Sequence, residues 1–139
     1  METENMVKIT FCLKRLPHLS AQDFQRHWYE VHAPLVRKHR KALRIVRYVQ
    51  FHSDLGPLTE KLRAFRHSPE PYDGVAEIWY ESREALEELG KDASARAASR
   101  ELLEDEKHFV DLARSPIFAG EEKAIVSPFF GGLGTPRLP

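Results

Sequence analysis

The sequence predicts an α+β fold of the ferredoxin-like type, with a four-stranded antiparallel sheet and the element order β-α-β-β-α-β. Four short segments alternate apolar and polar residues with the period of two that marks a half-buried strand. Two longer segments repeat apolar residues at helical spacing, and capping and turn residues separate all of these segments. A chain of 139 residues is long enough for one such domain.

The first strand and the first helix are expected near the N-terminus. Residues 6–14 alternate as a strand, which Pro17 ends. Ser20 then caps a helix, with Asp23 reaching back toward it as in a capping box. The helical spacing predicts a buried stripe made of Phe24, Trp28, Val31 and Leu35.

A proline interrupts this first helix. The ring of Pro34 would clash with the carbonyl of Glu30, and the residue before a proline is disfavoured in the α region. We therefore expect a kink or break at His32 and Ala33, with a new helical start at Pro34. His27 is expected on the opposite flank of the stripe from His32, too far round the helix for both to hold one atom.

The remaining elements follow the same patterns. A strand over 44–52 places Val46, Tyr48, Gln50 and His52 on one face and Ile45, Arg47, Val49 and Phe51 on the other. After it come a short helix near 58–65, a strand over 75–80, a short helix capped by Ser82, a helix over 93–114 and a strand over 117–126. Helices would cover one face of the sheet. Because the other face also carries apolar residues, two copies are expected to pack sheet to sheet.

Composition limits the possible partners. Lys and Arg together number 21, as do Asp and Glu, whereas a nucleic-acid binder of this size should carry a basic surplus. No apolar run approaches the ~20 residues that span a bilayer, and no signal peptide is recognised. Cys12 is the single cysteine, which excludes an internal disulfide and favours a cytoplasmic protein. We expect one domain over 1–127 and a Gly- and Pro-rich tail over 128–139.

Three residues are candidates for catalysis. His32 lies at the expected helix break, where an imidazole that titrates near neutral pH can face a pocket or, alternatively, satisfy a backbone carbonyl beside Pro34. Glu77 lies within an apolar strand and is either a general base, the partner of a histidine, or half of an ion pair with Arg47 or another strand cation. Tyr48 is expected on a pocket floor, where its hydroxyl can hydrogen-bond an acidic oxygen.

A second set of residues is predicted to line a pocket for a flat, hydrophobic ligand. This set contains Trp28, Phe11, Gln50, His52, Trp79 and Phe118. The alternative for the aromatic members is core packing, and for Gln50 and His52 an exposed face or a dimer seam. The sequence has no H-E-x-x-H, C-x-x-C or G-x-G-x-x-G motif, so neither a metal nor a cofactor is expected.

Four segments resemble the EthD family, a branch of the dimeric α/β-barrel superfamily. The helix stretch Phe24-x-x-His27-Trp28-x-x-x-His32-x-Pro34-Leu35 is similar to the family's F-x-x-[YH]-W-x-x-x-H-x-P-L. Residues 47–52 are similar to its R-Y-x-Q-x-H, 73–79 to its D-G-x-A-E-x-W and 105–111 to its D-E-x-x-F-x-D. Together these segments cover most of residues 6–126 in the right order.

The resemblance implies a homodimer whose two sheets form one barrel, with a pocket in each subunit between sheet and helices. Some fungal relatives decarboxylate polyketide acids, and members of the wider superfamily act on aromatic polyketides, lactones or haem. We therefore expect a cofactor-independent enzyme of the lyase or isomerase type. It would act on a hydrophobic aromatic or polyketide-like acid or lactone by acid–base chemistry, such as decarboxylation, isomerisation, cyclisation or dehydration. The alternatives are a non-catalytic small-molecule binding or accessory protein, and a haem-binding or haem-degrading protein.

Overall fold

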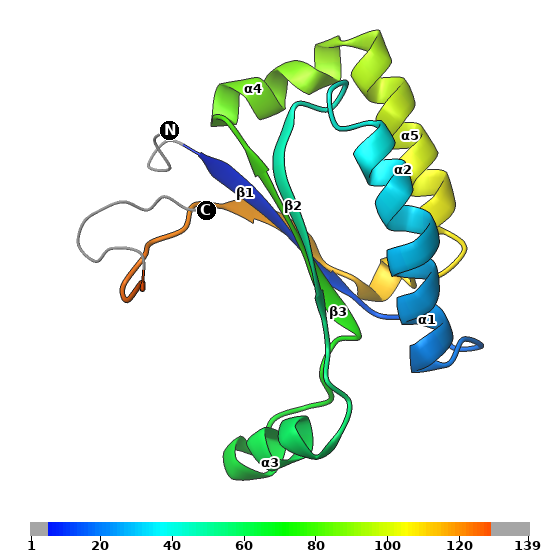
Figure 1. Cartoon of the computed structure of the whole chain (residues 1–139), viewed down its shortest axis with the longest axis vertical. Helices are drawn as coiled ribbons and strands as arrows, with labels where there is room; N and C mark the ends of the chain where they lie inside the picture. Colours follow the sequence, from blue (N-terminus) through cyan, green and yellow to red (C-terminus); the bar gives the residue numbers. More distant parts are fainter. Residues whose placement is uncertain (1–5, 129–139) are drawn as a thin grey trace.

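Figure 1 shows the fold in the computed structural model, which describes residues 6–128. The elements in chain order are β1 (Val7–Leu13), α1 (Ala21–His27), the π-helical segment η1 (Trp28–His32), α2 (Ala33–Lys38), β2 (Ile45–His52), α3 (Pro57–Arg66), β3 (Gly74–Tyr80), α4 (Arg83–Glu88), the 3₁₀ turn η2 (Leu89–Lys91), α5 (Ala93–Glu106), the 3₁₀ turn η3 (Leu112–Arg114) and β4 (Ile117–Gly120). The predicted tail lies, beyond its first residue, outside the described residues.

The four strands form one antiparallel sheet in the order β2-β3-β1-β4. This arrangement confirms the predicted ferredoxin-like α+β fold. Figure 1 shows α1, α2 and α5 together on one side of the sheet, and α3 beyond the ends of β2 and β3, away from those helices. The face that α1, α2 and α5 cover is called the helical face below, and the opposite one the open face.

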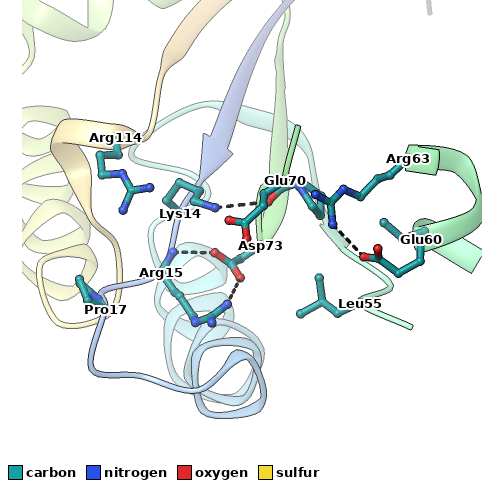
Figure 2. A pocket seen from close by; sticks show the side chains of 11 residues that line it. Lys14, Arg15, Pro17, Leu55, Glu60, Arg63, Glu70, Asp73 and Arg114 are labelled. Carbon is teal, nitrogen blue, oxygen red and sulfur yellow. Dashed lines mark hydrogen bonds and ion pairs between the residues drawn. The ribbon is translucent and has the colours of Figure 1, made fainter. Parts of the chain in front are cut away.

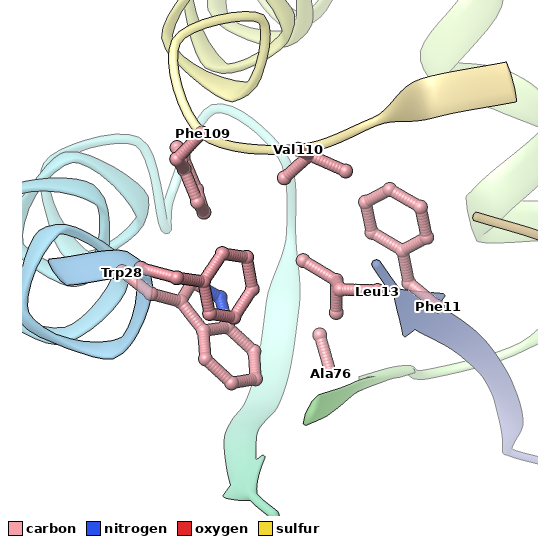
Figure 3. Close-up of a cluster of buried hydrophobic side chains, with 7 residues drawn as sticks. Phe11, Leu13, Trp28, Ala76, Phe109 and Val110 are labelled. Atoms are coloured by element: carbon pink, nitrogen blue, oxygen red, sulfur yellow. The ribbon is translucent and has the colours of Figure 1, made fainter. Parts of the chain in front are cut away.

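The core fills the space between the helical face and the helices. Leu13, Phe24, Trp28 and Phe109 are at most 1% exposed. The centroid of the Phe24 ring lies 5.6 Å from that of Trp28 and 5.5 Å from that of Phe109. Figure 3 shows side chains of β1, β3, η1 and the segment after α5 converging in this cluster. Because burial of each large apolar side chain contributes about 1.5–3 kcal/mol, the cluster holds the helices to the sheet.

The first helix does not break at Pro34, but it is irregular where predicted: the π-helical segment ends at His32 and α2 begins at Ala33, one residue before the predicted start. The N–H of Ala33 donates to the carbonyl of Trp28, five residues earlier, which makes one wide π turn. Pro34 then falls in the first turn of α2, where its missing N–H is tolerated. A wide turn accommodates the proline as well as a break would, and α1, η1 and α2 run on as one rod (Figure 1).

The π turn also shifts the buried stripe of this rod by one residue. After Phe24 and Trp28, the buried positions are His32 and Val36, whereas Val31 is 49% exposed. The predicted place of Val31 in the stripe was therefore wrong. The reason is the extra residue in the π turn, which rotates every later side chain relative to an unbroken α-helix. Its consequence is that His32 points into the protein.

β2 contains an irregularity that its alternating pattern does not reveal. The pairing of β2 with β3 shifts between Ile45 and Arg47, as in a β-bulge. Ile45 therefore shares the helical face with Tyr48, where both line the same cavity. The predicted face of Ile45 was wrong for this reason. Arg47 remains on the open face, with its guanidinium 4.9 Å from the ring centroid of Trp79.

Two predicted boundaries ran too far toward the C-terminus. α5 ends at Glu106 rather than near 114, because the chain beyond it pairs with the segment that follows β1. The N–H of Leu16 donates to the carbonyl of Phe109 at 3.0 Å as part of this pairing. β4 ends at Gly120 rather than 126 because its partners in β1 extend only over residues 8–11.

Gly74 of β3 lies against the Trp28 ring. A Cβ at this position would lie 2.7 Å from Cη2 of Trp28 and 2.9 Å from the carbonyl oxygen of Phe51. Since the ring is buried and the carbonyl belongs to the sheet, we expect Gly74→Ala to destabilise the protein by about 1–3 kcal/mol in denaturant unfolding. Gly90→Ala is the control, because a Cβ there meets nothing within 4 Å. Equal stabilities of the two variants would contradict this packing.

Candidate functional site

A cavity of about 340 Å³ lies between the helical face of the sheet and the helical layer. Its lining comes from all four strands and from η1, α2, α4, η2 and α5. Most of this wall is aliphatic or aromatic. The polar groups of the lining are the side chains of His32, Tyr48, Tyr80, Ser99 and Glu106. An apolar cavity with a few polar groups is the usual form of a small-molecule site.

His32 reaches the cavity from η1, and one of its ring nitrogens is held by a carboxylate. The residue is 4% exposed, and its Nδ1 lies 2.8 Å from Oδ2 of Asp105. Burial lowers the pKa of His32, which the hydrogen bond to Asp105 offsets only in part. The neutral ring therefore donates from Nδ1 to the carboxylate, and Nε2 carries a lone pair suited to a general base.

Asp105 accepts hydrogen bonds from two histidines. Its Oδ1 lies 3.0 Å from Nε2 of His27, and its Oδ2 lies within reach of both rings. Burial alone would raise the pKa of Asp105, but the hydrogen bonds from His32 and His27 outweigh it and lower that pKa. The prediction that His27 and His32 cannot hold one atom was wrong, because the π turn between them brings both rings to the same flank.

Glu106 stands on the other side of the His32 ring. Its Oε2 lies 3.6 Å from Nε2 of His32, and its side chain lines the cavity. Burial raises the pKa of Glu106 to about 7, and the charge of Asp105 adds to the rise. Near neutral pH this carboxyl can therefore either give or take a proton. The cavity wall thus combines a base nitrogen with a carboxyl group poised to exchange protons beside it.

Tyr48 enters the same cavity from β2. Its hydroxyl accepts a hydrogen bond from Nε2 of Gln50 at 3.0 Å. Burial raises the pKa of Tyr48 to about 12, although hydrogen bonds from Gln50 and Trp28 oppose the rise and the charge of Glu106 adds to it. The hydroxyl is therefore protonated at neutral pH and can serve as a hydrogen-bond donor.

Some of the predicted site residues meet at this cavity. His32, Tyr48, Trp28 and Phe11 all line it, although Trp28 and Phe11 also belong to the buried core. Gln50 and His52 lie next to it instead. Together with Tyr48 and several residues of the α1–α2 rod, including Arg26 and Arg37, they line a neighbouring hollow of about 560 Å³. Their own contacts are internal, because Gln50 bonds the Trp28 carbonyl and His52 bonds Gln50.

Glu77, Trp79 and Phe118 do not reach the cavity. Cross-strand partners share a face, and Glu77 pairs with Thr10, which also pairs with Phe118. Glu77, Thr10 and Phe118 therefore all lie on the open face. Trp79, which pairs with Lys8, lies on the same face. Glu77 forms an ion pair with Lys8 at 3.1 Å, which matches the alternative of a partnership with a strand cation. The structure therefore does not place Glu77 beside His32, or Trp79 and Phe118 in its pocket.

Asp105 and Glu106 were not among the predicted site residues. A signal for them was present, since both belong to the D-E-x-x-F-x-D segment that resembles the family. Helical spacing could not reveal their role, because adjacent residues of an α-helix point in different directions. Both reach the His32 ring because it lies between them, with Nδ1 toward Asp105 and Nε2 toward Glu106.

A polar hollow of about 300 Å³ lies at the end of the sheet near α3 (Figure 2). Its charged side chains are largely paired with one another. Arg15 contacts Asp73 at 2.6 Å and Arg63 contacts Glu60 at 2.9 Å. Lys14 donates to the carbonyl of residue 71. Nε of Arg63 is buried without a hydrogen-bond partner among the described residues, but the other charges named here are paired. Since no histidine lines the hollow either, the His32 cavity is the better candidate site.

The raised pKa of Glu106 predicts a pH-dependent stability. In the unfolded chain this carboxyl ionises near its ordinary pKa of 4.5, whereas in the folded chain it ionises near 7. The protonated carboxyl of Glu106 is compatible with burial, so the free energy of unfolding is highest below pH 4.5. It falls as the pH rises toward 7, because the unfolded chain then releases this proton more readily than the folded chain. The loss is on the order of 3 kcal/mol. Glu106→Gln cannot ionise, so it should be the more stable protein at pH 8.

Urea unfolding of both proteins at pH 4.5 and pH 8 measures this difference. Glu104→Gln on the same helix is the control, because Glu104 is exposed and pairs with Lys107 at the surface. Relative to wild type, the free energy of unfolding of Glu104→Gln should not rise between pH 4.5 and pH 8 as that of Glu106→Gln does. A Glu106→Gln variant that loses stability equally at both would show that the buried carboxyl is ionised in the native protein.

Two further properties concern the described residues, 6–128. Within that range, no group of three or more His, Cys, Asp and Glu side chains is arranged to hold a metal ion. No helix among the same residues has the length and apolar character needed to cross a bilayer.

Comparisons with known proteins agree with this fold. A protein of the ethyl tert-butyl ether D family from Bacillus halodurans is 21% identical, with 85% of this chain and 99% of that chain covered and a TM-score of 0.56. A hydroxynitrile lyase from Passiflora edulis is 14% identical, with 89% and 99% covered and a TM-score of 0.56. A dimeric ferredoxin-like protein of unknown function from Jannaschia sp. is 12% identical, with 85% and 100% covered and a TM-score of 0.51. A comparison with curated proteins gave no match.

The family profile covers the residues that build the site. The EthD domain profile matches residues 16–113, which is more than half of the chain. That range holds the α1–α2 rod with His27 and His32, β2 with Tyr48, and α5 with Asp105 and Glu106. The chain therefore belongs to the EthD family.

Proposed function

We propose that this protein is a cofactor-independent enzyme that performs acid–base chemistry on a hydrophobic aromatic or polyketide-like acid or lactone in the His32 cavity. One observation carries the proposal. Asp105, His32 and Glu106 form a line of proton-exchanging groups, with contacts of 2.8 Å and 3.6 Å, and the line ends at an apolar cavity. Titratable groups with shifted pKa values in an apolar pocket are typical of catalytic sites.

The contacts support a separate role for each group. Asp105 holds His32 in the tautomer that leaves Nε2 as the base, because the carboxylate accepts from Nδ1. Nε2 can then take a proton from a ligand in the cavity, and Glu106 can give a proton back or pass one on. Tyr48 can hydrogen-bond an oxygen of the ligand. Decarboxylation, isomerisation, cyclisation and dehydration each include proton transfers that these groups can supply.

The similarity to solved structures supports the proposal through the fold alone. The Passiflora edulis protein, a hydroxynitrile lyase, shares the fold at 14% identity. One lyase is therefore built on this scaffold, but a fold shared at that level does not fix a reaction.

Thermal shift against a panel of aromatic ketones, lactones and acids, followed by mass spectrometry of each mixture, tests the proposal. We expect at least one stabilising compound to be converted. A control reaction with heat-unfolded protein separates enzymatic from spontaneous conversion. If compounds stabilise the protein and none is converted, the protein is instead a small-molecule binding or accessory protein that uses the same cavity.

We also propose that two copies form a homodimer through the open face. Large apolar side chains on this face are exposed, with Phe51 at 61% and Phe118 at 56%. The Jannaschia protein with the same fold is described as dimeric, which supports this assembly.

Charged residues on the open face should break the dimer. We expect Phe51→Asp combined with Phe118→Asp to raise the dimer dissociation constant by at least about 100-fold, because the charges would be buried without partners. Sedimentation equilibrium measures this constant. Val31→Asp is the control, since Val31 is similarly exposed but lies on the helical layer. A double variant that remains dimeric would place the interface elsewhere.

A further inference from the structure

We infer that the cavity takes an uncharged, apolar compound whose carbonyl oxygen accepts a hydrogen bond from Tyr48, rather than a carboxylate. This inference rests on the proposed function: of the ligands proposed there it keeps the lactones and excludes the acids as carboxylates, and it adds ketones and aldehydes. It follows from the charges that line the cavity, from the hydrogen bonds of Tyr48 and from the position of His32 and Glu106.

The charges at the cavity leave a bound anion without a partner. Among the described residues that line it, none is a lysine or an arginine. The acidic groups nearest to its polar end are Glu106 and Asp105, which would repel a carboxylate. A charge moved from water into an apolar site without a counter-ion is strongly disfavoured. A neutral ligand avoids both the repulsion and the lost hydration.

The cations of the described chain lie elsewhere. Lys8 and Arg47 stack on the Trp79 ring at 5.0 Å and 4.9 Å, on the open face of the sheet. Arg26 and Arg37 line the neighbouring hollow outside the cavity, and further cations line the polar hollow near α3. None of these cations lines the cavity, although Tyr48 is common to the cavity and to the hollow that holds Arg26 and Arg37.

Tyr48 has a hydroxyl proton to offer to a ligand. Its oxygen accepts from Gln50 at 3.0 Å and from Trp28, and in the hydrogen bonds of residues 6–128 it donates to no protein acceptor. A buried hydroxyl that has an acceptor role filled still needs an acceptor for its own proton. A carbonyl oxygen in the cavity supplies that acceptor. Gln50 is itself held by the Trp28 carbonyl at 2.8 Å, which orients the pair.

The resulting step is proton transfer next to a carbonyl. The C–H bond beside the carbonyl breaks, its proton goes to Nε2 of His32, and its electron pair becomes the C=C bond of an enolate. The carbonyl π electrons move to the oxygen, where the hydrogen bond from Tyr48 stabilises the charge. When the proton returns from Nε2 to a carbon of the enolate, the carbonyl and the neutral histidine are regenerated. No step changes an oxidation state, so no oxidant or co-reactant is required.

Ligands of similar shape but different charge show whether the cavity prefers a neutral compound or a carboxylate. The probes are 4-isopropylacetophenone, methyl 4-isopropylbenzoate and 4-isopropylbenzoate, titrated calorimetrically at pH 8 into wild type and into His32→Ala. We expect the ketone and the ester to bind at least about 10-fold more tightly than the carboxylate. Carboxylate that binds as tightly, or that displaces the ketone at comparable concentration, overturns the inference, as does a failure of both neutral probes to bind.

Variants locate the preference in the cavity. Tyr48→Phe should weaken binding of the ketone by about 3- to 10-fold and leave 4-isopropyltoluene, which has no carbonyl, unaffected. Leu103→Lys adds a cation at a partly exposed lining position and should raise the affinity for the carboxylate. If Tyr48→Phe lowers the affinity for the ketone and for the hydrocarbon equally, Tyr48 does not hydrogen-bond the carbonyl of the ligand.

Proton exchange separates this inference from the proposed function. Wild type should catalyse exchange of the methyl protons of 4-isopropylacetophenone in D₂O, and His32→Ala should not. If the two proteins exchange these protons at the same rate while the neutral probes remain preferred, then the proposed catalytic role of His32 fails and the ligand class stands.

Discussion

Replacing His32 by alanine is expected to lower turnover of any compound converted in the cavity by about 10²- to 10⁴-fold. Nε2 of His32 lies 3.6 Å from Glu106, which lines the cavity with it, and Asp105 holds the other ring nitrogen at 2.8 Å. The variant removes the base but leaves the cavity walls and Glu106 in place. Initial rates, with circular dichroism as a check on folding, measure the effect. The substrate is whichever compound the screen shows to be converted.

Two further variants give this prediction a sharp control. His39→Ala removes a histidine that bonds Glu101 at 2.8 Å outside the cavity, and turnover should be unchanged. Asp105→Asn keeps the shape but loses the charge that fixes the tautomer, so kcat should fall and the pH profile of kcat should move. If His32→Ala and His39→Ala retain equal activity, His32 is a structural partner of Asp105 and not a base.

The fold could be predicted because its signals are local. Alternating residues in β1 and β3, the cap at Ser20 and the cap at Ser82 all formed the expected elements. The details that failed depend on contacts distant in sequence. The end of α5 is decided by pairing of the Phe109 segment with the chain after β1, and no helical periodicity encodes that pairing.

The candidate site could be predicted only in part for a similar reason. Alternation shows that Glu77 and Ala76 point to opposite faces, but it cannot tell which face the helices cover. Register settles that question, since Ala76 lies opposite Phe11 in the core and Glu77 opposite Thr10 on the open face. Likewise, Pro34 signalled an irregular helix, but the form of the irregularity decides where His32 points.

Trp28→Ala is expected to destabilise the protein by about 3–5 kcal/mol, the largest effect on stability among these predictions. The indole is 1% exposed, stacks on His52 with ring centroids 4.5 Å apart, and touches Phe24. It also lies over Gly74, where the backbone comes too close for any side chain. Its removal leaves a cavity that β3 cannot fill, because the strand is fixed by its pairing with β1 and β2. Denaturant unfolding at pH 7 measures the loss.

Trp79→Ala supplies the matched control, since it deletes a tryptophan side chain from the open face of the sheet, whereas Trp28 of η1 packs against the helical face. Trp79 is partly exposed and contacts Lys8 and Arg47 rather than the core, so its loss should cost the subunit roughly 1 kcal/mol. Its effect should instead appear in the dimer dissociation constant, because the open face is the proposed interface. Similar stability losses for the two variants, measured below that dissociation constant, would contradict the assignment of Trp28 to the core and Trp79 to the open face.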